Sequence, residues 1–165
     1  MKKGLLYVMT VCMGLYGCGQ EKLSESVYNE GINLIPAPAC IEQGEGAFVL
    51  NRGTDICVSH DSLRTVASFY AQKMRTATGY ELPLAGAEGR EHAICLSIDP
   101  TIAGDEAYCL DVNPQKVDVR ASSLRGLFYG MASLMQLLPA EIESGECVSG
   151  AEWQIPAVTV KDTPR

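Results

Sequence analysis

The sequence has few of the residues on which most catalytic and metal sites depend. Its 165 residues include two histidines, His60 and His92, and one tryptophan, Trp153. The histidines lack metal-ligand spacing to each other and to the cysteines, so no metal site is predicted. There is no glycine-rich phosphate loop, internal repeat or low-complexity tract. We therefore expect neither a cofactor nor a metal.

Basic residues are also scarce, with 13 Lys and Arg against 20 Asp and Glu and a formal net charge of −7. A chain without a basic stripe lacks the electrostatic footprint of proteins that bind nucleic acid or anionic lipid. Both are therefore poor candidates as partners.

The chain begins with "MKKGLLYVMTVCMGLYGC", in which two lysines precede an apolar run over residues 4–15. A basic flank and an apolar run of this length predict a secretory signal, since a membrane-spanning helix needs about 20 apolar residues. The ending, with Cys18 directly after Gly17, resembles the lipobox of bacterial lipoproteins, whose cysteine is lipidated and becomes the new N-terminus. We expect a lipoprotein signal peptide over 1–17 and lipidation at Cys18. The alternatives are an ordinary signal peptide and an uncleaved anchor.

Cleavage before Cys18 would leave 148 residues, the length of one domain, with 11 basic and 20 acidic side chains. Residues 18–31 are polar without periodicity and are predicted to form a tether. One domain is expected over 32–165, exported and lipid-anchored to the bacterial cell envelope. The membrane face that displays it and the oligomeric state stay open.

Five of the seven cysteines follow Cys18 in the sequence, spread out and without any C-x-x-C pair. Their odd number means that they cannot all pair among themselves. Three lie inside strand-like runs, where a free cysteine packs as a small hydrophobic residue. Core packing is therefore favoured over a disulfide or a metal site, and the disulfide state stays open. The five are Cys40, Cys57, Cys95, Cys109 and Cys147.

Apolar patterns predict two helices. The first, about Asp61–Thr78, has apolar residues at three- and four-residue steps, a possible N-cap at Ser59 or Asp61, and a C-cap at Gly79. Its apolar stripe is Leu63, Val66, Ala67, Tyr70, Met74 and Ala77. The second, about Ser123–Leu138, has an apolar face made by Leu124, Leu127, Phe128, Met131, Leu134, Met135 and Leu138.

Strands are expected between and around these helices, as period-two or continuous apolar runs. Two of them flank a turn-rich link and predict a hairpin, while Gly126 and Gly130 in the second helix predict its close approach to the sheet. The order favours an α+β fold, a mostly antiparallel sheet with two helices on one face. The expected strands are 47–50, 55–59, 93–99, 108–112, 117–121 and 153–161.

The segments "GLFYGMASLMQLLP" and "WQIPAVTVKDTPR" carry a family resemblance. Together with "INLIPAPACIEQGEGAFVL", they resemble the non-catalytic domain that precedes the barrel in glycoside hydrolase family 20, the β-N-acetylhexosaminidases. The resemblance extends over residues 32–165. It implies a catalytic TIM barrel in cis, absent from this sequence, that would begin after Arg165 with an aromatic residue and a Trp/His-Arg-Gly segment.

In that family the acetamido oxygen of the substrate attacks the anomeric carbon, assisted by an adjacent Asp-Glu pair in the barrel. The pair Asp105-Glu106 here opens a hairpin strand, so we interpret it as a solvated loop. Trp153 is expected to pack in the core, and Arg165 belongs to the linking segment. Glu141, Glu143 and Glu146 form an acidic loop with no partner base. No catalytic residue is predicted, and this chain alone is expected to be inactive.

Two hypotheses follow. In the first, the chain is the N-terminal supporting domain of a lipid-anchored enzyme that removes terminal non-reducing N-acetylhexosamine from glycans by substrate-assisted retaining hydrolysis, and glycan is bound only through the barrel. In the second, it is a freestanding lipoprotein module that binds glycan or a protein partner. A further alternative is the pre-barrel domain of another glycoside hydrolase family. The parent glycan and linkage stay open.

Overall fold

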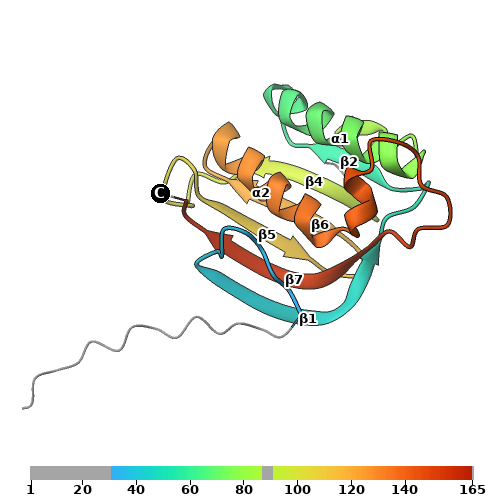
Figure 1. Ribbon diagram of the computed structural model, residues 1–165. Helices are drawn as coiled ribbons and strands as arrows, with labels where there is room; N and C mark the ends of the chain where they lie inside the picture. Colours follow the sequence, from blue (N-terminus) through green and yellow to red (C-terminus); the bar gives the residue numbers. More distant parts are fainter. Residues whose placement is uncertain (1–30, 87–90, 165) are drawn as a thin grey trace, which may run out of the picture.

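The computed structural model describes residues 31–86 and 91–164, which form a single sheet and a helix layer (Figure 1). The sheet has seven strands in the order β1-β7-β5-β6-β4-β2-β3. The strands are β1 (Cys40–Val49), β2 (Asp55–Val58), β3 (Leu84–Gly86), β4 (Ala93–Ile98), β5 (Tyr108–Val112), β6 (Val117–Ala121) and β7 (Gln154–Asp162). The helices are α1 (Arg64–Thr78) and α2 (Leu124–Leu137), with short 3-10 helices η1 (Asp61–Leu63) and η2 (Ala140–Glu143).

The sheet has an antiparallel half and a parallel half. The antiparallel half, which has more paired residues, consists of β1, β7, β5 and β6. The parallel half consists of β6, β4, β2 and β3. The predicted α+β class with a mostly antiparallel sheet is confirmed, as is the β5–β6 hairpin. The parallel half was not predicted. Its β2–β3 pair is possible because α1 supplies the crossover that consecutive parallel strands require, and β5 lies between the parallel strands β4 and β6 in sequence.

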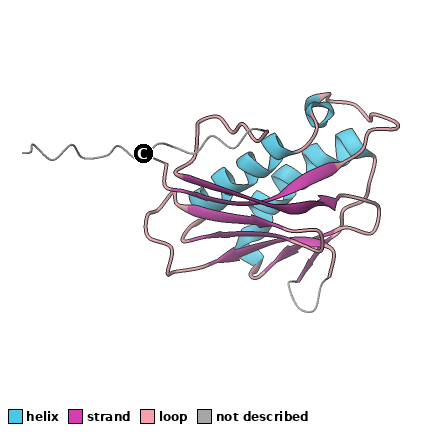
Figure 2. Cartoon of the chain, turned by 90° about the horizontal axis from the view of Figure 1, so that it is seen from below, coloured by secondary structure: helices cyan, strands magenta, loops and turns pink. Residues whose placement is uncertain are grey.

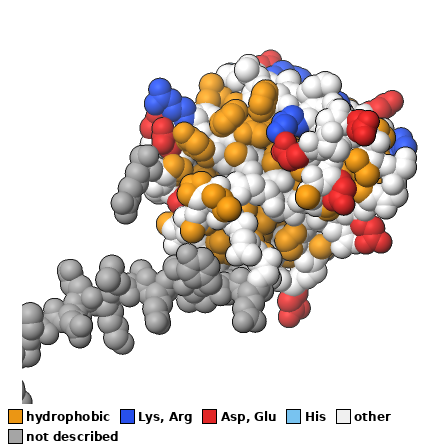
Figure 3. All heavy atoms as spheres, viewed as in Figure 1, with side chains coloured by type: hydrophobic (Ala, Val, Ile, Leu, Met, Phe, Trp, Pro, Cys, Tyr) orange, Lys and Arg blue, Asp and Glu red, His pale blue; other side chains and the backbone are white. Residues whose placement is uncertain are grey.

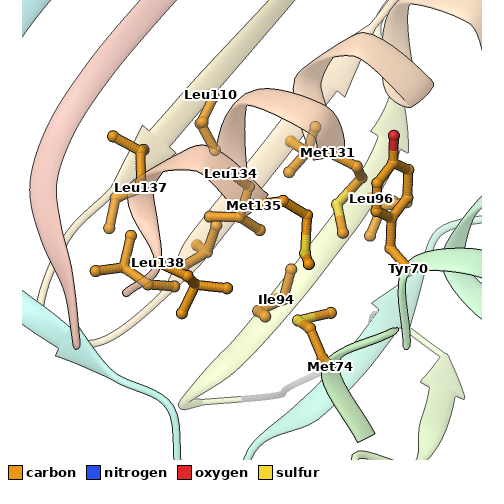
Figure 4. Close-up of a cluster of buried hydrophobic side chains, with 14 of the residues drawn as sticks. Tyr70, Met74, Ile94, Leu96, Leu110, Met131, Leu134, Met135, Leu137 and Leu138 are labelled. Carbon is orange, nitrogen blue, oxygen red and sulfur yellow. The ribbon is translucent and has the colours of Figure 1, made fainter. Parts of the chain in front are cut away.

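Both helices lie on the same side of the sheet (Figures 1 and 2). The main core fills the space between, where side chains from α1, α2 and β4 meet. Tyr70 and Met74 point from α1 toward Met131 of α2, with Ile94 and Leu96 of β4 beside them (Figure 4). No helix in the described ranges covers the other face of the sheet, and its side chains alternate with those of the core along each strand.

Helix α1 forms where the sequence predicts it, and its apolar stripe is buried as expected. Burial of each large apolar side chain contributes roughly 1.5–3 kcal/mol. The predicted N-cap at Ser59 or Asp61 is wrong, because the N-cap is His60. Its Nδ1 accepts a hydrogen bond from the N–H of Ser62 at 3.2 Å, at the start of η1. Gly79 ends the helix with φ 67°, as predicted.

Ser123 is the N-cap of α2, and its hydroxyl accepts hydrogen bonds from the N–H groups of Arg125 and Gly126. Most of its predicted apolar face is buried, but Leu124 and Phe128 are 44% and 43% exposed. Their predicted place on the buried face is wrong, because the apolar arc of α2 is wider than the part that the sheet and α1 cover. The two side chains instead belong to an outer surface.

Two glycines set the distance between α2 and the sheet, as predicted. A Cβ built on Gly126 would overlap the carbonyl oxygen of Ala107 and lie 2.8 Å from the Cβ of Ala121. A Cβ on Gly130 would lie 2.7 Å from Cγ1 of Val119. Both approaches are tighter than packed carbon atoms allow. Glycine is therefore required if α2 is to rest on β5 and β6 at this height.

The strands differ from the predictions mainly at the edges of the sheet. β1 starts at Cys40, seven residues before the predicted strand, and its pairing with β7 is irregular between Gln43 and Ala47. The short edge strand β3 was not predicted, because three residues carry no usable periodicity. The predicted signal peptide and all but one residue of the tether lie outside the described residues.

Candidate docking surface on the helix layer

Four large apolar side chains stand exposed on the outer side of the helices. They are Phe69 of α1 and Leu124, Phe128 and Tyr129 of α2, which are 53%, 44%, 43% and 39% exposed. We call them the helix-layer patch. Figure 3 shows hydrophobic side chains gathered over this side of the molecule. Contiguous exposed apolar groups of this kind mark interaction sites on soluble domains.

The aromatic rings of the patch are in mutual contact. The ring of Phe128 lies 5.8 Å from that of Phe69 and 6.3 Å from that of Tyr129, centroid to centroid. Beneath them Tyr70 lies 5.3 Å from Phe128 and 5.0 Å from Phe69, the latter edge to face. Such tilted and edge-on pairs are the favourable geometries for aromatic rings. The patch is therefore an ordered cluster that bridges α1 and α2.

Tyr70 ties the two helices together below the patch. Its hydroxyl donates to the carbonyl oxygen of Phe128 at 3.0 Å. Burial raises the pKa of Tyr70 to about 12, because the phenolate would lose its hydration. The side chain is thus neutral at physiological pH, and it acts as a fixed donor between the helices.

A groove of about 490 Å³ runs from the patch toward η2. Its walls include Phe69, Phe128, Leu138 and Ile142, and its rim is an ion pair in which Nζ of Lys73 lies 3.0 Å from both carboxylate oxygens of Glu143. The predicted absence of a basic partner in the acidic loop is therefore wrong for Glu143, because Lys73 is far away in sequence and only the fold brings it there.

The chemistry of this surface fits docking better than catalysis. The groove walls are mostly apolar, and the charged side chains on its rim neutralise each other in the Lys73–Glu143 pair. An apolar centre with a polar rim is the usual anatomy of a protein–protein or interdomain interface. A second protein surface is thus a better occupant of the groove than a charged small molecule.

The Asp105-Glu106 pair lies away from this groove, in the turn before β5. Asp105 is exposed, and Nη1 of Arg125 donates to its carboxylate at 3.0 Å in a surface ion pair. The interpretation of the pair as a solvated loop agrees with this position. Trp153 is 3% exposed and packs in the main core, which confirms its predicted role. Cys18 and Arg165 lie outside the described residues.

The two histidines have structural roles at separate places. His60 caps η1, whereas His92 stacks on Phe48 at 4.7 Å and its Nε2 lies 2.9 Å from the side-chain amide of Asn51. Within the described ranges no cluster of three or more His, Cys, Asp or Glu side chains is arranged to hold a metal ion. None of the helices described there has the length and apolarity needed to cross a bilayer.

The helix-free face of the sheet carries a polar network that the sequence did not reveal. Nη2 of Arg120 on β6 lies 2.7 Å from the carboxylate of Asp111 on β5, and Nη1 lies 3.5 Å from the carboxylate of Asp99. Thr159 of β7 donates to the other oxygen of Asp111 at 2.9 Å. Burial opposes ionisation of Asp111, but these hydrogen bonds outweigh it and hold its pKa below the usual range. The network links three strands.

Comparison with known proteins identifies the family of this domain. Residues 31–163 match Glycosyl hydrolase family 20, domain 2. The chain belongs to this family. It is 33% identical over 98% of its length to 22% of a β-hexosaminidase of Porphyromonas gingivalis. It is 30% identical over 81% of its length to 26% of a β-N-acetylhexosaminidase of Cellulomonas fimi.

Solved structures agree with this assignment. A mutant Streptomyces plicatus β-hexosaminidase in complex with its product GlcNAc superposes with a TM-score of 0.74 at 38% identity, over 80% of this chain and 26% of that one. The family 20 β-N-acetylhexosaminidase of Streptomyces coelicolor gives 0.73 at 38% identity, over 79% and 26%. This chain thus spans only about a quarter of the length of these relatives.

Proposed function

We propose that this chain is the supporting domain of a lipid-anchored β-N-acetylhexosaminidase, and that a catalytic barrel in the same protein docks on the helix-layer patch. The full enzyme would remove terminal non-reducing N-acetylhexosamine from glycans by substrate-assisted retaining hydrolysis. The support comes from the match to family 20 domain 2 and from relatives that are hexosaminidases several times longer than the matched region.

The patch is the observation that carries the docking proposal. Leu124, Phe69 and Phe128 expose about half of their surface to solvent, although the same helices bury their inner faces completely. Covering the exposed part of one such side chain is worth about 1 kcal/mol. Left exposed, these side chains contribute no burial energy, whereas a docked barrel would bury them around Tyr70.

Activity assays with a chimera test this function. The region of the Porphyromonas gingivalis β-hexosaminidase that matches this chain is replaced by residues 31–164, and release of nitrophenol from a nitrophenyl N-acetyl-β-glucosaminide is measured. We expect an active chimera and no activity from this chain alone, because the family resemblance implies that the catalytic Asp-Glu pair belongs to the barrel. Activity of the pure chain would overturn the supporting role. A folded but inactive chimera would count against the family assignment of function.

Substitutions in the patch test the docking surface. The variant Phe69→Ser with Leu124→Ser should lower the temperature of half-inactivation of the chimera more than it lowers the unfolding temperature of the chain alone. The matched control is Val49→Ser on β1, which is 46% exposed and follows the buried Phe48, so that its side chain lies on the helix-free face. If the patch variant lowered the two temperatures by the same amount, as the control is expected to do, the patch would be rejected as the docking site.

The lipid anchor rests on the sequence of the first 18 residues. A basic start, an apolar run and a cysteine after glycine support export followed by lipidation at Cys18, which would attach the domain to the cell envelope. Labelled palmitate should be incorporated into the full chain and should disappear in Cys18→Ala. Label of undiminished intensity in Cys18→Ala would show that the chain is not anchored through this residue.

A further inference from the structure

The sheet register places two cysteines directly opposite each other. Cys57 on β2 and Cys95 on β4 are cross-strand partners in the parallel pair. Neighbouring strands are separated by about 4.8 Å, and disulfides join residues whose Cα atoms lie about 4.4–6.8 Å apart. Both side chains lie on the same, helix-free face, because Ile56, Val58, Ile94 and Leu96 on the alternate positions enter the main core.

The two thiols are also buried together. Cys57 is 0% and Cys95 5% exposed, and they form a small cluster with Ala93, against which Ala85 packs. The neighbouring Cys57 thiol contributes to the raised pKa of Cys95, as expected for two groups in close proximity. The pair therefore already has the contact, the burial and the common orientation that a covalent bridge needs.

The other cysteines of the described ranges have no such partner in the sheet. Cys109 on β5 and Cys40 on β1 are separated by β7, where Lys161 lies between them in register. Two strand spacings amount to about 9.6 Å, beyond the reach of a disulfide. Cys147 lies beside Gly79 at the end of α1, in the helix layer. The topology thus selects one pairing out of those that five cysteines allow.

We propose that Cys57 and Cys95 form a disulfide that staples β2 to β4. The two thiols lose two protons and two electrons, and the oxidant is a disulfide such as oxidised glutathione or that of an oxidoreductase. One cysteine thiolate attacks this disulfide, forms a mixed disulfide and releases one thiol. The thiolate of the second cysteine then attacks the mixed disulfide and releases the other thiol. An exported protein meets such oxidants, whereas a cytosolic one is kept reduced.

Burial sets the expected kinetics. Desolvation, together with the neighbouring Cys57 thiol, raises the pKa of Cys95 to about 12, so the reactive thiolate is rare in the folded protein. The bridge should therefore form quickly while the chain is unfolded and slowly after folding. Once formed, it should resist dithiothreitol under native conditions and be reduced readily in urea.

Peptide mapping of the full chain provides the test and does not depend on export. The chain is refolded from urea with a tenfold excess of oxidised over reduced glutathione, alkylated, digested and analysed by mass spectrometry without reduction. We expect a linked Cys57–Cys95 peptide and alkylated Cys40, Cys109 and Cys147. Full alkylation of both Cys57 and Cys95, or linkage of either to another cysteine, would overturn the proposal.

Stability measurements give an independent readout. The bridge closes a loop of 39 residues, counted from Cys57 to Cys95, that includes all of α1. Reduction should lower the unfolding temperature of the wild type by about 5–15 °C. It should have no effect on Cys57→Ala with Cys95→Ala, while Cys109→Ala, equally buried on the same face, should behave as the wild type. If reduction shifted none of the three proteins, the proposed staple would be refuted.

Discussion

The substitution Gly126→Ala tests how closely the helix layer rests on the sheet. In an ordinary helix interior this change stabilises by about 1 kcal/mol, because alanine has the higher helix propensity. Here the added Cβ meets the carbonyl oxygen of Ala107 and lies 2.8 Å from the Cβ of Ala121. Neither contact can be relieved by rotating a side chain, since one is backbone and the other is a Cβ.

The clash can therefore be relieved only if α2 moves. To restore an ordinary carbon–carbon distance of about 3.5–4.0 Å, the helix must shift by roughly 1 Å from β5 and β6. A gap of that size costs up to about half of the dispersion energy of the contacts it opens, including those of Leu127 and Met131. Overpacking of this kind typically costs about 1–3 kcal/mol. With the propensity gain of about 1 kcal/mol subtracted, we expect a net destabilisation of up to about 2 kcal/mol.

Urea unfolding followed by the fluorescence of Trp153 measures this loss, because the indole is 3% exposed in the fold and becomes solvated on unfolding. The matched control is Gly86→Ala, where an added Cβ meets no heavy atom within 4 Å. The control should be neutral or slightly stabilised. If Gly126→Ala were instead more stable than the wild type by about 1 kcal/mol, the close approach of α2 would be wrong.

Three further predictions concern other parts of the fold. Tyr70→Phe should cost about 0.5–1.5 kcal/mol through loss of the hydrogen bond to Phe128, and it should remove part of the stability loss of the wild type between about pH 10 and 12, as followed by alkaline unfolding. Because folding lowers the pKa of Asp111, its ionised carboxylate contributes stability to the fold at pH values above its unfolded pKa of about 3.9. This contribution is lost as the pH falls through the folded pKa. Asp111→Asn should thus be less stable than the wild type at pH 6 and lose less stability on acidification to pH 2. Trp153→Ala should cost about 3–5 kcal/mol by calorimetry, because it empties a core site.

The predictable part of the fold was the part encoded in local patterns. The stripe that includes Met74, the C-cap at Gly79 and the pair Gly126 and Gly130 gave α1, α2 and their distance from the sheet. The parallel half could not be predicted in the same way, because the strand order depends on pairing between distant segments. The three residues of β3 are likewise too short to show a period.

The candidate surface was only partly predictable for a related reason. Leu124 and Phe128 have the spacing of buried residues, and nothing local shows that the sheet and α1 cover a narrower arc than α2 presents. The ion pair between Lys73 and Glu143 joins positions 70 residues apart. The family resemblance implied a barrel, but the residues that would meet it became visible only as exposed rings on a folded helix layer.

The two faces of the sheet divide the requirements of a supporting domain. On one face, α2 must stay at a fixed height if Phe128 and Leu124 are to meet a second rigid surface, and glycine contacts with β5 and β6 fix that height. On the other face, the Arg120–Asp111 network joins β6 and β5, and the Cys57–Cys95 pair lies across β2 and β4, in the parallel half where pairing is weaker per residue. The patch can hold a fixed position only if the sheet beneath it is rigid. Links between neighbouring strands on the helix-free face add rigidity to the sheet, and so to the position of the patch on the opposite face.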